Sequence, residues 1–196
     1  MPLVCVDFYG MDPAFDYIAV DNFHGMQRLT QKVIVCGHER IGFVGTPLAT
    51  ESIMDRYMGY CKAMEVNGPS LREDWLIYDR EEDGYTTILN VSLPEELPTA
   101  FVCNCDRSAR LLIEQLARRR LRVPEDVSVA GFDHSYVSVA EGLTMTTYEC
   151  DERTLAREGL KALLKRMEGK GGPAGIRIIE GELVEGNTVA RLERQP

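Results

Sequence analysis

The sequence lacks a long hydrophobic run and an excess of basic charge. No apolar stretch in its 196 residues approaches the roughly 20 residues that a membrane-spanning helix needs. Its 22 lysines and arginines are outnumbered by 31 aspartates and glutamates, which gives a net charge of −9. Such an anion repels phosphate backbones, so we expect no membrane span and no direct binding of this polypeptide to DNA, RNA or an anionic membrane.

The common catalytic and nucleotide-binding motifs are also missing. The sequence contains no GxxxxGK[ST] or GxGxxG loop and no GxSxG elbow. Its three histidines are scattered, and only His134, which follows Asp133, suggests an acid–base pair. We therefore expect no catalytic residue, no cofactor and no metal ligand, while a small α/β hydrolase using His134 remains a minor alternative.

Six cysteines stand mostly inside apolar runs, at positions 5, 36, 61, 103, 105 and 150. Cys103 and Cys105 are two residues apart, which is neither a CxxC pair nor a zinc pattern. The N-terminal segment 1–7 has no basic start and no cleavage site. These features predict reduced thiols in a cytoplasmic protein.

Short apolar runs alternate with segments of helical periodicity along the whole chain. The runs predict strands, and the periodic segments predict helices that begin at cap residues such as Asn22, Asp106 and Asp151, and at a capping box formed by Ser52 and Asp55. The expected strands are 3–6, 17–20, 41–45, 75–78, 100–103, 127–131, 176–180 and 188–192, and the expected helices are 22–36, 52–67, 84–91, 106–120 and 151–167. This alternation predicts an α/β fold with a doubly wound parallel sheet covered on both faces.

Polar residues that directly follow the predicted strands are the candidate ligand-binding residues, because ligands bind beyond the carboxyl ends of parallel strands. Several carboxylates with one arginine suit a neutral, hydroxyl-rich ligand. The alternative is that Asp7, Asp106 and Asp133 only cap helices or strand ends. The candidates are Asp7, residues 46–52 with Arg56, Asp79, residues 104–106, Asp133 with His134, and Tyr148 with Glu149.

Five segments at these positions resemble, in order and spacing, the motifs of the lactose-repressor family. One is Val20-Asp21-Asn22 leading to Cys36-Gly37-His38-Glu39-Arg40-Ile41-Gly42-Phe43-Val44-Gly45. Another is Arg56-Tyr57-Met58-Gly59-Tyr60, and a third is Pro98-Thr99-Ala100-Phe101-Val102-Cys103-Asn104-Cys105-Asp106. The fourth runs from Val123-Pro124-Glu125-Asp126 to Gly131-Phe132-Asp133, and the fifth is Leu143-Thr144 with Tyr148-Glu149.

The resemblance implies the effector-binding domain of a bacterial transcription regulator, similar in fold to periplasmic sugar-binding proteins. Two lobes of such a domain clamp a small molecule, here a sugar or sugar derivative, and thereby control a helix-turn-helix head that binds operator DNA. By this resemblance the effector-binding residues are Asp7, Ser52, Arg56, Asp79, Cys105, Asp106, Asp133 and Tyr148. Cys105 replaces the usual asparagine, and Asp79 aligns with a position that is often aromatic. An exported sugar-binding protein of a transporter is the alternative.

The same comparison predicts the lobes. Residues 21–147 and 169–196 should form a complete C-terminal lobe, whereas 1–20 and 148–168 should be fragments of an N-terminal lobe. We expect the segment to be truncated, without its DNA-binding head. Family members usually form homodimers, so the helix 106–120 and the loop after Asp133 should form an interface, with Leu111, Leu112 or Tyr136 partly exposed in the monomer.

Overall fold

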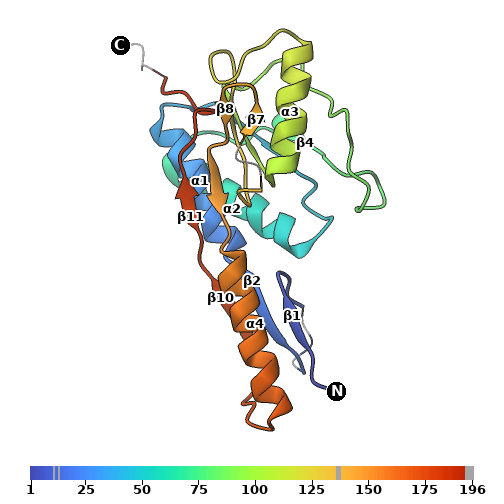
Figure 1. The fold of residues 1–196 in the computed structure, drawn as a ribbon. Coiled ribbons are helices and arrows are strands. Elements are labelled where there is room, and N and C mark those ends of the chain that lie inside the picture. Colours follow the sequence, from blue (N-terminus) through green and yellow to red (C-terminus); the bar gives the residue numbers. More distant parts are fainter. Residues whose placement is uncertain (11, 13, 136–137, 193–196) are drawn as a thin grey trace. The chain divides into compact units, whose positions relative to one another are not determined.

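The computed structural model describes residues 1–10, 12, 14–135 and 138–192, and the chain divides into two compact units. Unit 1 comprises Met1–Asp21 and Cys150–Gly181. Unit 2 comprises Asn22–Glu149 and the segment that starts at Glu182. The chain therefore passes between the two units three times. Figure 1 shows the elements of both units along the chain.

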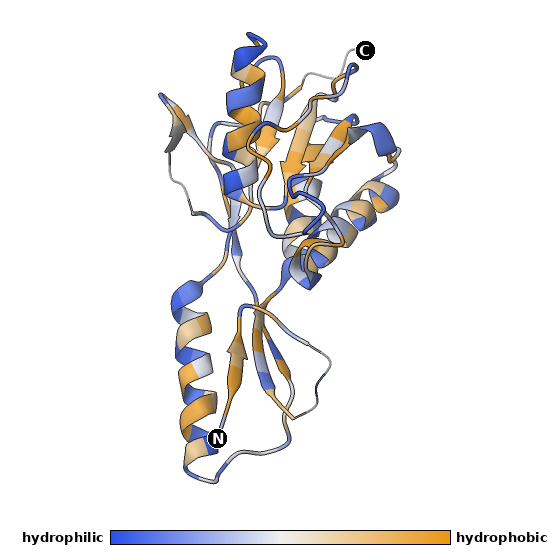
Figure 2. Ribbon diagram, turned by 90° about the vertical axis from the view of Figure 1, so that its right-hand side faces the viewer, coloured by the Kyte–Doolittle hydropathy of each residue, from blue (hydrophilic) through white to orange (hydrophobic). Residues whose placement is uncertain are grey.

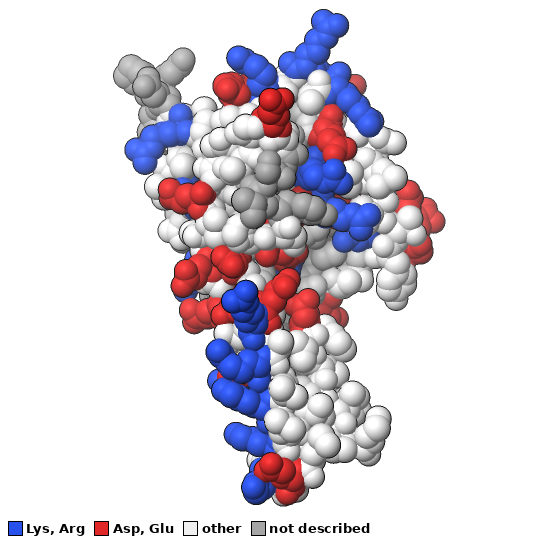
Figure 3. Space-filling view, viewed as in Figure 1, with Lys and Arg blue, Asp and Glu red and all other residues white. Residues whose placement is uncertain are grey.

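Unit 1 is a small parallel sheet with one helix. The strands β1 (Val4–Val6), β2 (Asp16–Val20) and β10 (Ile176–Ile179) lie in the order β1-β2-β10. Helix α4 (Glu152–Met167) packs on β1 and β2, and the Asp151 carboxylate caps it by accepting a hydrogen bond from the Thr154 N–H at 2.9 Å. Lysine and arginine side chains line the outer side of α4 (Figure 3).

Unit 2 is built on a four-stranded parallel sheet. Its strands are β3 (Ile41–Val44), β4 (Leu76–Ile77), β5 (Ala100–Cys103) and β6 (Ser128–Ala130), in the order β4-β3-β5-β6. Nearly every strand residue is buried, as in a sheet that is covered on both faces. Two antiparallel pairs complete the unit, β7 (Ser138–Ala140) with β8 (Leu143–Thr144) and β9 (Thr147–Glu149) with β11 (Glu182–Val184).

Helices cover both faces of this sheet. Helix α2 (Glu51–Asn67) contacts one face, where Tyr57 and Tyr60 lie against Phe43 of β3. Helix α1 (Asn22–Val35) packs on α2 so closely that a Cβ on Gly59 would lie 2.2 Å from the Phe23 carbonyl oxygen. Helix α3 (Asp106–Arg118) covers the other face over a core of strand and helix side chains that includes Val44, Phe101, Cys103, Leu112, Leu116 and Val129. Figure 2 shows hydrophobic residues along the strands and mixed residues along the helices.

The strand order determines where a ligand site can form. From β3 the chain moves outward to β4, and it then returns to the opposite side of β3 to form β5 and β6. The direction of winding therefore reverses between β3 and β5. Ligands of open parallel sheets bind beyond the carboxyl ends of strands at such a switch point. The predicted parallel α/β architecture is confirmed.

The predicted helix over 84–91 is wrong, since this segment forms no helix. The Asp83 carboxylate accepts hydrogen bonds from the N–H groups of Tyr85 and Thr86, each at 2.8 Å, and Gly84 has a positive φ of 74°. An antiparallel bridge between Arg80 and Thr87 closes the turn. An aspartate that binds nearby backbone N–H groups favours a turn over a helix. The β-branched threonines that follow have a low helix propensity, so they do not favour a helix here either.

Two predicted caps are also wrong. Helix α2 is capped by Thr50, whose hydroxyl accepts a hydrogen bond from the Ile53 N–H at 3.2 Å, and not by Ser52. Asp106 lies in the first turn of α3, and Cys105 occupies the cap position without a side-chain hydrogen bond. The Asp106 carboxylate instead accepts a hydrogen bond from the Thr147 hydroxyl at 2.7 Å. In both helices a neighbouring side chain or a tertiary contact outweighs the local preference.

The C-terminal segment 188–192 is not a strand. Its backbone is held by scattered bonds, such as the Val129 N–H to the Thr188 carbonyl at 2.8 Å and the Ala190 N–H to the Ser128 hydroxyl at 2.9 Å. These bonds do not form a regular ladder.

The observed units differ from the predicted lobes at three places. Asp21, predicted in the C-terminal lobe, belongs to unit 1. Residues 169–181 belong to unit 1, because Arg177 of β10 pairs with Ile18 of β2. Residues 148–149 belong to unit 2, because β9 pairs with β11.

The expected exposed leucines on α3 are wrong as well. Leu111 and Leu112 are 5% and 0% exposed, since they face the sheet. Tyr136 lies outside the described residues.

All six cysteines are free thiols; Cys36, Cys103 and Cys150 are buried, and the other three are half-buried. Among the helices of the described part of the chain, none combines the length and apolar character needed to cross a bilayer.

Candidate functional site

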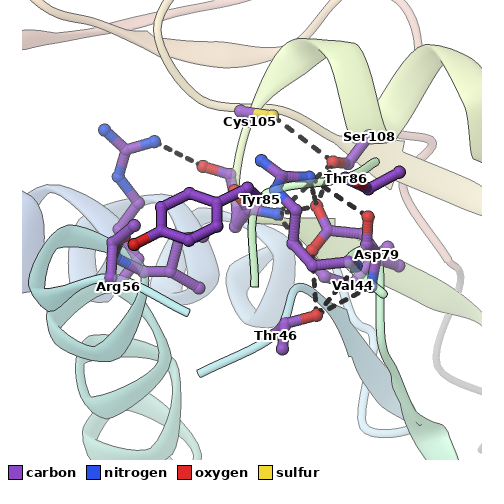
Figure 4. A network of polar contacts seen from close by, with 12 residues as sticks. Val44, Thr46, Arg56, Asp79, Tyr85, Thr86, Cys105 and Ser108 are labelled. Atoms are coloured by element: carbon purple, nitrogen blue, oxygen red, sulfur yellow. Dashed lines mark hydrogen bonds and ion pairs between the residues drawn. The ribbon is translucent and has the colours of Figure 1, made fainter. Parts of the chain in front are cut away.

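A buried carboxylate organises the loops that follow β3, β4 and β5. Asp79 follows β4 and is 0% exposed. Its Oδ2 atom accepts hydrogen bonds from Asn104 Nδ2 at 2.5 Å, from Arg80 Nη1 at 2.9 Å and from the Ser108 hydroxyl. The Thr46 hydroxyl donates to Oδ1 at 3.3 Å and accepts from the Asp79 N–H at 3.1 Å. This network, which Figure 4 shows, ties together the ends of three strands.

Arg56 is the buried cation of the site. It projects from α2 and its side chain is 9% exposed. Its Nε donates to Asn22 Oδ1 at 2.7 Å, and its Nη1 donates to the Asn104 carbonyl at 2.6 Å. Its guanidinium also lies 4.0 Å above the Phe132 ring. Backbone and side-chain groups from three elements therefore fix the orientation of this guanidinium.

Asp133 completes the polar pair. It follows β6, and its Oδ1 lies 3.0 Å from Arg56 Nη2, with 31% of its side chain exposed. Asp133 and His134 both have positive φ angles, 95° and 55°. Non-glycine residues with such backbones are strained, and they occur preferentially at functional sites. The sequence analysis placed Arg56 and Asp133 in one site, and the structure brings their side chains together.

A count of donors shows what Arg56 still offers. A guanidinium has five N–H donors. The contact to Asn22 uses the N–H of Nε, the contact to Asn104 uses one N–H of Nη1, and the contact to Asp133 uses one N–H of Nη2. One N–H on each terminal nitrogen is left, so Arg56 has two further donors for ligand oxygens.

The other predicted residues of unit 2 differ in accessibility. Ser52 is half-buried, and its hydroxyl lies 3.0 Å from that of Thr50. Cys105 is half-buried, with its sulfur 3.3 Å from the Ser108 hydroxyl. Asp106 and Tyr148 are 0% and 1% exposed.

Burial gives Asp106 and Tyr148 supporting positions. A Cβ on Gly131 would lie 2.0 Å from Asp106 Oδ1, so only glycine leaves room for this carboxylate. Tyr148 stacks on Phe132 at 5.0 Å between ring centroids, and Gly25 of α1 admits its ring. These two residues thus pack behind the ring that lies under Arg56.

Asp7 belongs to unit 1, whereas the other predicted site residues belong to unit 2. It follows β1, has a positive φ of 69°, and its N–H donates to the Ile18 carbonyl at 2.8 Å.

Two polar residues of this network, Arg80 and Ser108, were missed by the sequence analysis. Asn104, which was among the candidates, binds Asp79 through its side chain and Arg56 through its carbonyl. Arg80 and Ser108 bind the same carboxylate. One signal was present: Gly45, where a Cβ would lie 2.9 Å from Asn104 Cβ, marks the close approach of the two loops.

The titratable groups near the site do not form a nucleophile. Burial, with the nearby Cys105, Asp79 and Asp106 charges, raises the pKa of the Cys103 thiol, so the thiol stays protonated. His134 Nδ1 lies 3.2 Å from Glu149 Oε2, so the carboxylate that it contacts is that of Glu149. Among the described residues, no three His, Cys, Asp or Glu side chains are grouped as metal ligands would be.

Comparison with known proteins identifies the family of this chain. Residues 30–189 match the model of the periplasmic binding protein-like domain. The chain belongs to this family. It is 33% identical over 172 residues to the HTH-type transcriptional repressor PurR of Haemophilus influenzae (strain PittEE), a match that covers 87% of the chain and 51% of the repressor. It is 29% identical over 194 residues to PurR of Histophilus somni (strain 2336), covering 98% of the chain and 58% of the repressor.

Solved structures of this periplasmic binding protein-like fold agree. A LacI family transcriptional regulator from Enterococcus faecium with bound ribose superposes with a TM-score of 0.80 at 19% identity, over 98% of the chain and 71% of the regulator. A periplasmic binding protein/LacI transcriptional regulator from Alkaliphilus metalliredigens QYMF complexed with D-xylulofuranose gives 0.80 at 21% identity, over 96% and 71%. The chain thus spans about half the length of the curated repressors it matches.

Proposed function

We propose that this periplasmic binding protein-like domain is the effector-binding part of a transcription regulator of the lactose-repressor type, and that its effector is a neutral sugar. The observation that carries the proposal is the pairing of Arg56 with Asp133 at 3.0 Å beyond the carboxyl ends of the strands. The likeness to PurR repressors and to sugar-bound regulators supports it.

The chemistry of the pair suits vicinal hydroxyl groups. The two remaining N–H donors of Arg56 can bind hydroxyl oxygens, and the partly exposed Asp133 carboxylate can accept hydrogen bonds from hydroxyl groups. Arg56 and Asp133 neutralise each other, so the pair favours an uncharged polyol over an anion. Ser52 and Cys105, both half-buried, supply further weak polar contacts. Asp79, Asp106 and Tyr148 act as positioning residues, because they are buried behind the pair.

The proposed activity is binding and not catalysis. Sugar binding changes DNA affinity only if the sugar prefers one of two domain arrangements, and the same linkage makes DNA affect sugar affinity. Operator DNA would be contacted by a helix-turn-helix head and not by this acidic chain of net charge −9. This role places the protein in the bacterial cytoplasm, where the operator is.

We also propose that the protein acts as a homodimer through α3. The outward side of α3 carries Arg107, Arg110 and Glu114, so the contacts would be charged. Light scattering should then report a dimer whose dissociation increases with salt concentration. A monomer at every salt concentration would exclude this interface.

The test of sugar binding is a thermal-shift screen of the chain with ribose, xylulose and cellobiose at millimolar concentrations, followed by calorimetry for each sugar that raises Tm. For a sugar that raises Tm, Asp133→Asn should weaken binding by about 1–2 kcal/mol, roughly tenfold in Kd, because a charged acceptor becomes neutral. Asp126→Asn is the matched control, since Asp126 also pairs with an arginine, Arg122, at 3.0 Å but away from the site. No stabilising sugar, or an unchanged Kd in Asp133→Asn, would refute the proposal.

A further inference from the structure

Unit 1 contains a groove that the proposed effector site does not use. It lies between α4 and the strands β2 and β10, and its volume is about 280 Å³. The loop that joins α4 to β10 closes one end. Figure 3 shows the lysine and arginine side chains gathered along α4. The charged lining residues are Asp16, Glu158, Lys161, Lys165, Arg166 and Arg177.

One cation of the groove is fully compensated. Arg166 forms a two-pronged ion pair with Asp16, with Nε to Oδ2 at 2.6 Å and Nη2 to Oδ1 at 3.0 Å. This pairing lowers the pKa of Asp16, chiefly through the hydrogen bond from Arg166, so the carboxylate remains charged at neutral pH. Arg166 and Asp16 therefore add no net charge to the groove.

The other cations outnumber their carboxylate. Glu158 lies in the groove with its side chain 8% exposed and is the only remaining acid among the lining residues. It is shared by Lys161 at 2.8 Å and Arg177 at 2.5 Å, whose own side chains are 58% and 61% exposed. Arg157, which does not line the groove, lies 3.5 Å from the same carboxylate. The ammonium group of Lys165 pairs with no carboxylate in the described chain. Lys161, Lys165 and Arg177 against Glu158 leave an excess of two positive charges.

This excess is notable in a chain of net charge −9. A phosphomonoester carries about −1.5 to −2 charges at pH 7, which matches the excess. Lysine and arginine are the side chains that bind phosphate oxygens, the arginine by its planar fork. The groove therefore has the charge that a dianion requires.

The shape of the groove limits the size of the ligand. Its volume of about 280 Å³ lies just below the range of roughly 300–1,000 Å³ that is typical of small-molecule pockets. The loop that lines it contains Gly171, Gly172 and Gly175. A Cβ on Gly172 or Gly175 would meet no atom within 4 Å, so the backbone there is open to a ligand. A single phosphorylated sugar fits these dimensions, and an extended polymer does not.

We propose that this groove of unit 1 binds a small phosphomonoester of monosaccharide size, with Lys161, Lys165 and Arg177 holding the phosphoryl group. The site is separate in sequence and in residues from the Arg56–Asp133 pair, and it does not depend on the function proposed for that pair.

The test is calorimetry of the whole chain with glucose 6-phosphate, inorganic phosphate and glucose at low ionic strength. Glucose 6-phosphate should bind more tightly than inorganic phosphate, and glucose should not bind at this groove. Lys165→Gln should weaken glucose 6-phosphate about tenfold, because a charge-assisted hydrogen bond is lost. Glu158→Gln should tighten it, since it removes the competing carboxylate.

Arg153→Gln is the matched control. Arg153 is also exposed on α4 but does not line the groove, so its replacement should leave the affinity unchanged. Lys165 makes no side-chain contact that its replacement would break, and circular dichroism should show an unchanged fold. Equal weakening by Arg153→Gln would mean non-specific attraction to α4 and would overturn the proposal. Equal affinity for glucose 6-phosphate and inorganic phosphate would overturn the claim that the groove recognises a ligand of monosaccharide size. An unchanged affinity for glucose 6-phosphate in Lys165→Gln would overturn the whole proposal.

Discussion

Replacing Asp79 in two steps separates the charge of the buried network from its geometry. Asp79→Asn keeps the shape of the side chain. Its amide oxygen can occupy the Oδ2 position, where it accepts from Ser108, Asn104 and Arg80, while its NH₂ group faces the Thr46 hydroxyl. The three hydrogen bonds to the Oδ2 position can therefore persist with a neutral acceptor, whereas the bond that the Thr46 hydroxyl donates to Oδ1 is lost. Asp79→Ala removes the acceptor completely.

The expected losses follow from the number of bonds and their charge. A hydrogen bond to an ionised group contributes about 1.5–3 kcal/mol and a neutral one about 1 kcal/mol, so three bonds lose about 3 kcal/mol in Asp79→Asn. Relief from burying a carboxylate offsets part of this, which leaves a net loss of about 2 kcal/mol in the free energy of unfolding. Asp79→Ala also leaves the Arg80 charge without its partner in a site where the Arg80 side chain is 17% exposed. We expect a loss of about 4 kcal/mol for this variant.

The assay is urea denaturation followed by tryptophan fluorescence. Trp75, the single tryptophan, is 2% exposed and immediately precedes β4, so its emission reports the unfolding of unit 2. Asp126→Asn serves as the control, because Asp126 pairs with Arg122 at the surface and its loss should leave the urea midpoint nearly unchanged. A wild-type midpoint for Asp79→Asn would show that the charge is unimportant. Equal losses in the two variants would show that the geometry is unimportant, and either result would refute the reasoning.

Two further predictions concern packing and pH in unit 2. Gly59→Ala should cost about 1–3 kcal/mol of unfolding free energy, because the new methyl group would lie 2.2 Å from the Phe23 carbonyl oxygen; Gly172→Ala, in open space, is the control in thermal denaturation. Burial lowers the pKa of His38 below 6.5, so the unfolded chain takes up a proton first as the pH falls. Unit 2 should therefore lose stability from about pH 7 downward, and His38→Gln should flatten this slope in urea titrations at several pH values; an equal slope in the variant would contradict the assignment.

The parallel sheet and the central pair could be predicted from the sequence, because both depend on simple rules. Strand residues of unit 2 are apolar on both faces, and this pattern is specific to a covered parallel sheet. Asp133 lies directly after one strand. Another strand is followed by a loop and then by a helix, and Arg56 lies in the first turns of that helix. Because both strands are parallel members of one sheet, on either side of β5, their carboxyl ends lie at the same edge.

The supporting network could not be predicted, because it depends on tertiary contacts. Asp79 was predicted to contact a ligand, but Asn104 from the loop after β5 and Ser108 from α3 enclose its carboxylate. The helix predicted over 84–91 failed for a related reason, since Asp83 competes for the backbone N–H groups.

The three passages of the chain between the units make both units discontinuous, and this has a consequence for synthesis. Strand β2 is synthesised before the sheet of unit 2, whereas its partner β10 and the helix α4 are synthesised after that sheet. The sheet of unit 1 therefore cannot be completed until the sheet of unit 2 has been made. During translation β1 and β2 must remain unpaired with β10 in the meantime, and chaperones and proteases can bind them in that state.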